Sequence, residues 1–141
     1  MLKVISFNAR SLGRKLDLLN STLQSSHYDI VGICETWLDP SFTDAVLVDG
    51  LSYSVFRKDR VNRAGGGVCL LVASSLSAYP VVINSLYSDL EIVVVVVVVV
   101  RGIKYTFIVV YRPPGLDALS RSYASRLFTA RQHSLLCRAL Y

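Results

Sequence analysis

Charged side chains are scarce in this sequence of 141 residues. They make up 18% of the chain against 52% hydrophobic residues, a balance that excludes an intrinsically disordered protein. The length fits one domain with a sizeable hydrophobic core. Lysine and arginine outnumber the acids by 15 to 10, and the net charge of +5 gives a moderate preference for polyanions such as nucleic acids or phosphorylated substrates.

Cysteine is also rare, and its spacing excludes two kinds of site. Cys34, Cys69 and Cys137 are widely separated, odd in number and each preceded by an apolar residue, which fits neither a disulfide framework nor a zinc site. We therefore expect buried free thiols in a reducing intracellular compartment, nuclear or cytoplasmic. The first ten residues have too short an apolar part and no cleavage site for a signal peptide, so secretion is not expected.

No apolar run is long enough to cross a membrane as a helix. The run from Ile92 to Val100 has nine residues, whereas a bilayer requires roughly 20. The sequence therefore predicts no membrane partner. Residues 93–100 are eight consecutive valines, for which two interpretations stay open: a central strand buried on both faces, or a degenerate stretch.

The first part of the chain has the pattern of a strand, a helix and a second strand. Residues 3–7 favour a strand that stops at Asn8, and leucines at helical spacing predict a helix over about 12–25 with Ser11 as its N-cap. The continuous apolar run 29–34 is typical of a strand covered on both faces. This order predicts a layered α/β fold.

The rest of the chain adds four predicted strands and a second helix. Residues 37–50 are predicted to form a loop, and a helix is predicted from Leu116 onward, where arginines are the only charged residues after Asp117. No linker divides the chain, so residues 1–141 are expected to form a single domain. The predicted strands are 51–57, 67–73, 90–100 and 103–111, the last two joined in a hairpin at Arg101-Gly102.

Three polar residues follow predicted strands at the point where each strand ends. Asn8 follows VISF, Glu35 follows DIVGIC and Tyr111 follows FIVV. If these strands are neighbours in one sheet, the three side chains converge at an edge of the kind where open α/β sheets bind ligands. A carboxylate suits Mg²⁺, and asparagine and tyrosine suit phosphate oxygens. A solvated strand terminus is the more common case for any one such residue, so both interpretations stay open.

Four sequence blocks around these residues resemble the endonuclease/exonuclease/phosphatase family. The blocks are FNARSL, DIVGICETWLD, YSVFRKDRVNRAGGGVCLLV and FIVVYRPP, which occur in the family order over about residues 3–115. Each block alone is a weak signal, and their order makes the set specific. The likeness is greatest to the endonuclease domain of non-LTR (LINE-type) retrotransposons. The resemblance implies a layered α/β sandwich of the DNase I-like type and a Mg²⁺-dependent phosphodiesterase that acts on DNA.

The resemblance also implies roles for the three residues. Glu35 matches the glutamate that holds Mg²⁺ at the scissile phosphate, and Asn8 matches the asparagine that orients the catalytic groups. Tyr111 matches the tyrosine that contacts the attacked phosphate. Arg10 stands where many apurinic-type enzymes have an acidic residue, and NARSL is a familiar form of this block in the retrotransposon branch.

Two further blocks of the family are missing. A Gly-Asp-x-Asn block would supply the Asp that activates the attacking water, and a Ser-Asp-His block would supply the His that contacts the phosphate; neither occurs in the sequence. His27 is predicted to be a surface residue at the end of the first helix, and His133 a solvated residue in the second. We therefore expect the chain to hold about the first half of the domain, to stop inside the second helix and to be catalytically inactive.

A truncated domain of this kind would contain one mostly complete sheet and two helices. The inner face of that sheet would be uncovered, an apolar surface larger than monomers usually expose. We therefore expect poor solubility or self-association through the exposed sheet face.

A basic segment precedes the glycines of the third block. As a functional site, Arg57, Lys58, Arg60 and Arg63 would contact phosphates along a DNA backbone. As a solvated hairpin loop, the same residues would have no such role and the glycines would serve the turn. Trp37, two residues after Glu35, is expected to pack in the core, with stacking on a base as the alternative.

The sequence leaves several functions open. The first is the N-terminal part of a retrotransposon DNA endonuclease, which the basic block before the glycines favours. The second is a phosphatase or phospholipase of the same family that acts on inositol phosphates or lipids. The third is a non-catalytic nucleic-acid-binding remnant, and a truncated gene product is the fourth.

Overall fold

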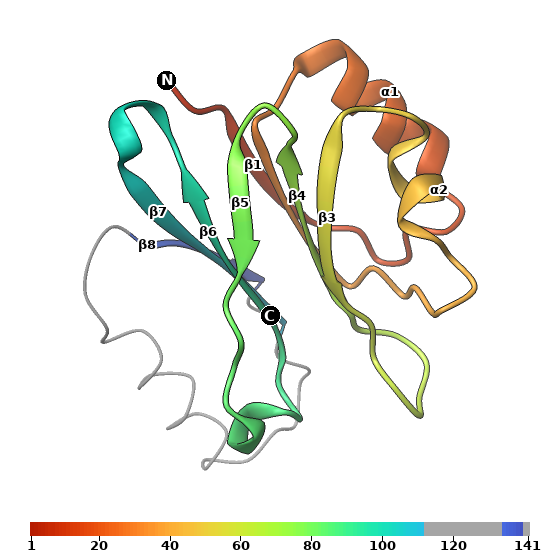
Figure 1. Ribbon diagram of the computed structural model, residues 1–141. Coiled ribbons are helices and arrows are strands. Elements are labelled where there is room, and N and C mark those ends of the chain that lie inside the picture. The colour runs from red at the N-terminus through yellow and green to blue at the C-terminus, as the bar shows by residue number, and fades with distance from the viewer. Residues whose placement is uncertain (112–133, 140–141) are drawn as a thin grey trace.

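The fold consists of two four-stranded β-sheets that pack face to face, with two helices on the outer face of the first sheet (Figure 1). The computed structural model describes residues 1–111 and the backbone of residues 134–139. The predicted layered α/β fold is confirmed. The first sheet has the strand order β1-β2-β4-β3 and comprises β1 (Val4–Asn8), β2 (Ile30–Cys34), β3 (Tyr53–Lys58) and β4 (Val68–Ala73).

The second sheet has the strand order β5-β6-β7-β8. It comprises β5 (Ser77–Pro80), β6 (Glu91–Val98), β7 (Lys104–Tyr111) and β8 (Ser134–Ala139). The helices are α1 (Leu16–Ser26) and α2 (Asp44–Val48), and two single 3₁₀ turns are η1 (Ser85–Tyr87) and η2 (Val100–Gly102).

The expectation of one mostly complete sheet with an uncovered inner face is wrong, because the second sheet covers that face. Leu70 and Val72 of β4 belong to the same buried cluster as Val95 and Val97 of β6, and none of the four is more than 2% exposed. This contact removes the apolar surface through which we expected the chain to self-associate.

Strand β2 is buried on both faces, as its apolar run predicted. Val31 and Ile33 pack with Leu19 and Leu23 of α1 in the cluster beneath the helices. The alternate residues of β2 face the second sheet, where Ile30 and Cys34 join the other cluster. The strand therefore fixes the position of its last residue between two packed layers.

The valine run forms β6, a central strand of the second sheet, as the first of the two interpretations predicted. Val93, Val95 and Val97 are buried against the first sheet, whereas Val94, Val96 and Val98 are only partly buried. The two faces of the run thus differ although its side chains are identical. Strands β6 and β7 form the predicted antiparallel hairpin, with Arg101 and Gly102 at positive φ in its turn.

Helix α1 begins four residues later than predicted, and Ser11 is not its N-cap. The Ser11 and Leu12 amides donate to the carbonyls of Glu35 and Thr36, at 3.0 and 2.8 Å. The chain therefore continues to pair alongside the end of β2 before it turns into the helix. Leu12 is buried, as expected for a core residue, but it lies in this loop and not on a helix.

Three other elements differ from the sequence-based expectation. The predicted loop 37–50 contains the short helix α2, which Thr43 caps by accepting from the Val46 amide. Strand β5 was not predicted, because its four residues end at a proline and carry little periodic signal. The segment Ser134–Ala139, expected to be helical, is strand β8 parallel to β7, so Arg138 lies on a strand. Residues 112–133, which contain most of the predicted second helix and His133, lie outside the described residues.

Candidate functional site

The ends of three strands meet at one end of the sandwich. Asn8 pairs opposite Cys34 across the parallel strands β1 and β2, and Glu35 is the next residue of the chain. The Cys34 thiol donates to the carbonyl of Val110 at 3.6 Å, which joins the ends of β2 and β7. Asn8, Glu35 and Tyr111 therefore lie near one another, although Tyr111 belongs to the second sheet and not to the sheet of the other two.

Glu35 and Tyr111 are hydrogen-bonded to each other across the two sheets. The Glu35 residue is 8% exposed, and the Tyr111 hydroxyl donates to its carboxylate. Burial, followed by this hydrogen bond and the negative charge of Glu35, raises the pKa of Tyr111 to about 12. The tyrosine is consequently a neutral hydrogen-bond donor at physiological pH.

An ion pair that the sequence did not indicate lies against Tyr111. Glu91, the residue opposite Tyr111 in the β6–β7 pairing, accepts two hydrogen bonds from the Arg60 guanidinium, one of them at 2.9 Å from Nη2. The guanidinium also lies 5.7 Å from the centre of the Tyr111 ring, within the range of a cation–π contact. The hydrogen bond to Glu91 is the main reason that the pKa of Arg60 is raised. Glu91, Arg60, Tyr111 and Glu35 thus form one connected polar cluster.

The glycine run 65–67 makes room for this cluster. Gly66 has a φ of +66°, and a Cβ at this position would overlap the Arg60 guanidinium. The carbonyl of Gly66 accepts from the Trp37 amide at 2.9 Å, and that of Gly67 accepts from the Thr36 amide at 3.3 Å. These glycines therefore allow a close approach next to the site, beyond the turn that the sequence predicted for them.

Several residues around the site have backbones in the left-handed region. They are Arg10, Ser11, Glu35 and Trp37, with φ values of 45°, 77°, 53° and 54°. Non-glycine residues rarely adopt this conformation, and such strain clusters at ligand-binding and catalytic sites. The Asn8 side chain supports this loop, because its Oδ1 accepts from the Arg10 amide at 3.0 Å.

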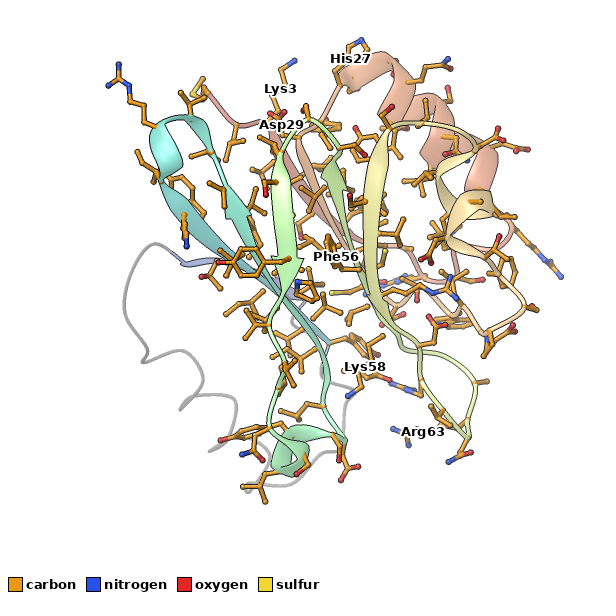
Figure 2. All side chains as sticks on the ribbon, in the orientation of Figure 1. Lys3, His27, Asp29, Phe56, Lys58 and Arg63 are labelled. Carbon is orange, nitrogen blue, oxygen red and sulfur yellow. The ribbon has the colours of Figure 1, made fainter. Side chains whose placement is uncertain are left out.

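Three of the four predicted phosphate-contacting residues are engaged within the protein. Arg57 pairs with Asp44 at 3.6 Å and with Asp59 at 3.1 Å, and Arg60 pairs with Glu91 as described above. The Lys58 ammonium donates to the carbonyls of Ser88 and Leu90, at 2.5 and 2.7 Å. Arg63 is exposed on the loop between β3 and β4, at the end of the molecule away from Lys3 and His27 (Figure 2).

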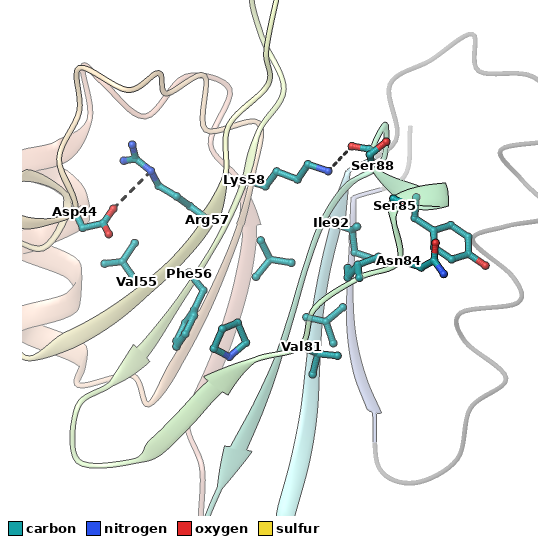
Figure 3. A pocket seen from close by; sticks show the side chains of 15 residues that line it. Asp44, Val55, Phe56, Arg57, Lys58, Val81, Asn84, Ser85, Ser88 and Ile92 are labelled. Carbon is teal, nitrogen blue, oxygen red and sulfur yellow. Dashed lines mark hydrogen bonds and ion pairs between the residues drawn. The ribbon is translucent and has the colours of Figure 1, made fainter.

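Arg57 and Lys58 point to opposite sides of β3, as the period of a strand requires (Figure 3). Arg57 reaches toward Asp44 of α2, whereas Lys58 spans a pocket of about 690 Å³ between β3 and the segment that carries η1. Lys58 therefore ties the edge of the first sheet to the second. The pocket is lined by residues of both sheets, among them Phe56 and Ile92, and by residues of the segment between β5 and β6, such as Val81.

The other residues that the sequence singled out lie outside the polar cluster. His27 is exposed and ends α1, as predicted. Cys34 and Cys69 are buried free thiols, also as predicted, and burial raises the pKa of Cys69 to about 12. The side chain of Cys137 lies outside the described residues. Trp37 is 50% exposed, so its predicted packing in the core is wrong.

A divalent cation would find few protein ligands at this site. Within the described residues, no three His, Cys, Asp or Glu side chains lie close enough together to hold a metal. Mg²⁺, however, is often held by one or two carboxylates and takes its other ligands from water and substrate phosphate. The buried carboxylate of Glu35, next to the strand end that carries Asn8, fits such a site.

The matched family agrees with the resemblance drawn from the sequence blocks. Residues 5–139 match the model of the Endonuclease/Exonuclease/phosphatase family. The chain belongs to this family. Among curated proteins, none matches the chain in sequence. Within the part of the chain that the structure describes, no helix has the length and apolar character needed to cross a membrane.

Solved structures with the same fold confirm its DNase I-like type. They include the endonuclease domain of TRAS1, a telomere-specific non-LTR retrotransposon, with a TM-score of 0.68, 16% identity, and coverage of 96% of this chain and 58% of that one. The AP endonuclease LMAP from Leishmania major has a TM-score of 0.60 and 16% identity, covering 86% of this chain and 43% of that one. The 3′ phosphatase NExo from Neisseria, bound to a product DNA hairpin, has a TM-score of 0.60 and 20% identity. The match covers 92% of this chain and 49% of that one. The chain thus spans about half the length of these solved structures.

Proposed function

We propose that this chain carries the Asn8, Glu35 and Tyr111 part of a Mg²⁺-dependent DNA endonuclease site of the non-LTR retrotransposon type. The observation that supports this most is the hydrogen bond between Glu35 and Tyr111, which joins the ends of two sheets next to Asn8. A buried carboxylate, an amide and a neutral phenol together suit a cation and a phosphate oxygen.

Each residue has a distinct part in this proposal. Glu35 binds the cation, and Asn8 holds the loop that carries Arg10 and orients the bound phosphate. Mg²⁺, when bound, would polarise the scissile phosphate. Tyr111 keeps its proton at physiological pH because its pKa is about 12, so it can donate to a phosphate oxygen once it leaves Glu35.

We propose DNA as the partner, with the end of the sandwich that carries Arg63 against the phosphate backbone. Arg63 is exposed and can contact a phosphate without losing an ion pair described here. For Arg57, Lys58 and Arg60, phosphate contact stays a prediction that requires exchange of their present partners. The two buried free thiols support a nuclear or cytoplasmic location.

We further propose that the chain alone does not hydrolyse DNA. No Gly-Asp-x-Asn or Ser-Asp-His block is present to activate water or to contact the phosphate through histidine. Catalytic groups of this kind act as a set, so the loss of the base and the phosphate-binding histidine costs several orders of magnitude in rate. A partial domain that binds nucleic acid without cleaving it is the state that these residues support.

Nicking of supercoiled plasmid by the purified chain tests this proposal, with DNA binding measured in parallel by fluorescence anisotropy. We expect salt-sensitive DNA binding in Mg²⁺ and no nicking above the level of an EDTA control. Mg²⁺-dependent nicking that Glu35→Ala abolishes would show that the chain is an active enzyme. Absence of DNA binding at low salt would contradict the proposed partner.

A phosphatase of the same family is the second candidate, since a 3′ phosphatase is among the proteins with this fold. The segment RKDRVNRAGGG favours DNA over inositol phosphates or lipids, because it resembles the retrotransposon branch of the family in particular. Release of phosphate from a 3′-phosphorylated oligonucleotide or from an inositol phosphate, without nicking of plasmid, would favour this second candidate.

A further inference from the structure

Trp37 is the single tryptophan of the chain, and half of its surface is exposed. Tryptophan is on average one of the most buried residue types, so exposure to this degree next to a candidate site calls for a reason. The residue follows Glu35 by two positions, so their Cα atoms are at most roughly 7 Å apart, the reach of two residues of extended chain. A ligand whose phosphate reaches Glu35 can therefore also reach the indole ring.

The backbone that carries Trp37 is fixed on both sides. Its amide donates to the carbonyl of Gly66 at 2.9 Å, and the preceding Thr36 is bonded to Gly67 on one side and to Leu12 on the other. Trp37 itself has a φ of 54°, a conformation that this pairing holds in place. Because the backbone is fixed before any ligand arrives, little conformational entropy is left to lose on binding at this position.

The indole lies beside the glycine run. A Cβ built on Gly65 would lie 3.6 Å from Nε1 and 3.7 Å from Cε2 of Trp37, so this part of the ring lies beside the turn. Glycine leaves that contact free of side chains. The ring thus lies next to the turn while half of the residue remains open to solvent.

Charged residues stand near Trp37 in the sequence and on the loop before the glycine run. The next residue, Leu38, is buried, whereas Asp39 is exposed and Arg63 is exposed on the loop that leads into the glycine run. A protein partner would favour a contiguous apolar patch, whereas a cation lies beside Trp37: a Cβ built on Gly65 would lie 3.6 Å from Nη1 of Arg60 and 3.6 Å from Nε1 of Trp37. A nucleobase offers one flat π-face next to a phosphate, which matches one ring and a nearby cation.

We propose that Trp37 is a stacking platform for an unpaired nucleobase of the strand whose phosphate lies at Glu35. This inference rests on the proposed DNA partner and adds a preference for single-stranded or unstacked DNA at the site. Stacking on an aromatic side chain is tolerant of sequence because every base has a π-face. The platform would therefore select the conformation of the strand, not its sequence.

The fluorescence of Trp37 tests the proposal directly, since the chain has no other tryptophan. The purified chain is titrated with a single-stranded oligonucleotide, with the same strand in a duplex and with an abasic-spacer strand of equal length. Affinity is measured separately by the anisotropy of end-labelled strands. We expect quenching by the single strand, and little quenching by the abasic strand even where anisotropy shows that it is bound.

Substitution of the ring gives the second readout. Trp37→Leu should weaken binding of the base-containing single strand by about 5- to 150-fold, the range measured for loss of one stacked base, and Trp37→Phe should retain much of the affinity. The abasic strand should bind Trp37→Leu as well as the original chain. Tyr79→Leu is the matched control, because Tyr79 is 43% exposed on β5 and should not affect either strand. Circular dichroism confirms that each variant folds.

The outcomes separate this inference from the proposed function. One outcome is that anisotropy shows DNA binding, while the tryptophan fluorescence is not quenched and Trp37→Leu binds with unchanged affinity. This outcome overturns the stacking platform and leaves the DNA partner intact. Equal losses for the abasic and base-containing strands also overturn it, because the ring would then act without a base. Failure of every strand to bind overturns the DNA partner and the platform together.

Discussion

Alanine at Gly66 should disrupt the polar cluster from the backbone side. The position has a φ of +66°, and an alanine Cβ there would overlap the Arg60 guanidinium. The guanidinium is the far end of a flexible side chain, but two hydrogen bonds to Glu91 hold it in place. It can therefore move only by giving up that ion pair, whose two side chains are 13% and 9% exposed.

The expected loss of stability has two parts. An alanine in the left-handed conformation costs roughly 1–2 kcal/mol, and loss of a charge-assisted hydrogen bond in a partly buried position costs about 1.5–3 kcal/mol. Gly66→Ala should thus lower the free energy of unfolding by about 2.5–5 kcal/mol. Gly50 offers a matched control, because its φ is +75° and nothing lies within 4 Å of a Cβ built there. Gly50→Ala should show only the first part, roughly 1–2 kcal/mol.

Urea denaturation followed by circular dichroism measures both variants, because the tryptophan signal lies too close to Gly66 for a neutral probe. A double-mutant cycle with Arg60→Ala completes the test. In that background Gly66→Ala should cost no more than Gly50→Ala, since the guanidinium is gone. Equal losses for Gly66→Ala and Gly50→Ala in the original chain would refute the reasoning.

Three further predictions follow from burial and charge. Relative to Tyr111→Phe, the original chain should lose stability as pH rises from about 10 to about 12. A pKa that is raised in the folded state stabilises the fold fully below the pKa of the unfolded chain, and this stability is lost as pH rises through the folded pKa. Urea denaturation at a series of pH values measures the free energy of unfolding of both chains. A difference between them that stays constant with pH would contradict the prediction. Val95→Ala should lower the free energy of unfolding, measured by urea denaturation, by about 2 kcal/mol. Val96→Ala should lower it clearly less, because Val95 is fully buried between the sheets and Val96 is only partly buried. Equal losses for the two variants would contradict this register. The Cys69 thiol, with its pKa of about 12, should react with Ellman's reagent at pH 8 only in urea, and fast reaction in the folded chain would refute its burial.

The sequence predicted those parts of the fold that have a local signal. The continuous apolar run gave β2, and the valine and aromatic runs with Arg101-Gly102 between them gave the β6–β7 hairpin. The order of blocks predicted one site for Asn8, Glu35 and Tyr111, and the structure places these residues near one another, while their roles stay predictions. These features depend on residues close together in the sequence, or on a resemblance that spans the blocks.

The features that the sequence missed depend on contacts between distant segments. Strand β5 has four residues, and β8 pairs with β7 across a long separation in the sequence, so neither has a periodic signal of its own. The pairing of Arg60 with Glu91 joins the loop between β3 and β4 to the second sheet and could not be predicted from either segment alone. The glycine run was the one sequence feature related to this pairing. Only the structure shows that a side chain at Gly66 would overlap the Arg60 guanidinium. The exposure of Trp37 likewise follows from the loop conformation and not from its hydrophobic neighbours.

The most direct test of the central claim is the effect of Mg²⁺ on the affinity of the chain for DNA, measured by anisotropy at constant ionic strength. If Glu35 binds a cation that also contacts a phosphate, Mg²⁺ should raise the affinity of the original chain and of Asp49→Asn, an exposed-carboxylate control. Glu35→Gln should show no such increase. An equal effect of Mg²⁺ in Glu35→Gln and in the original chain would contradict the assignment of Glu35 as the metal ligand.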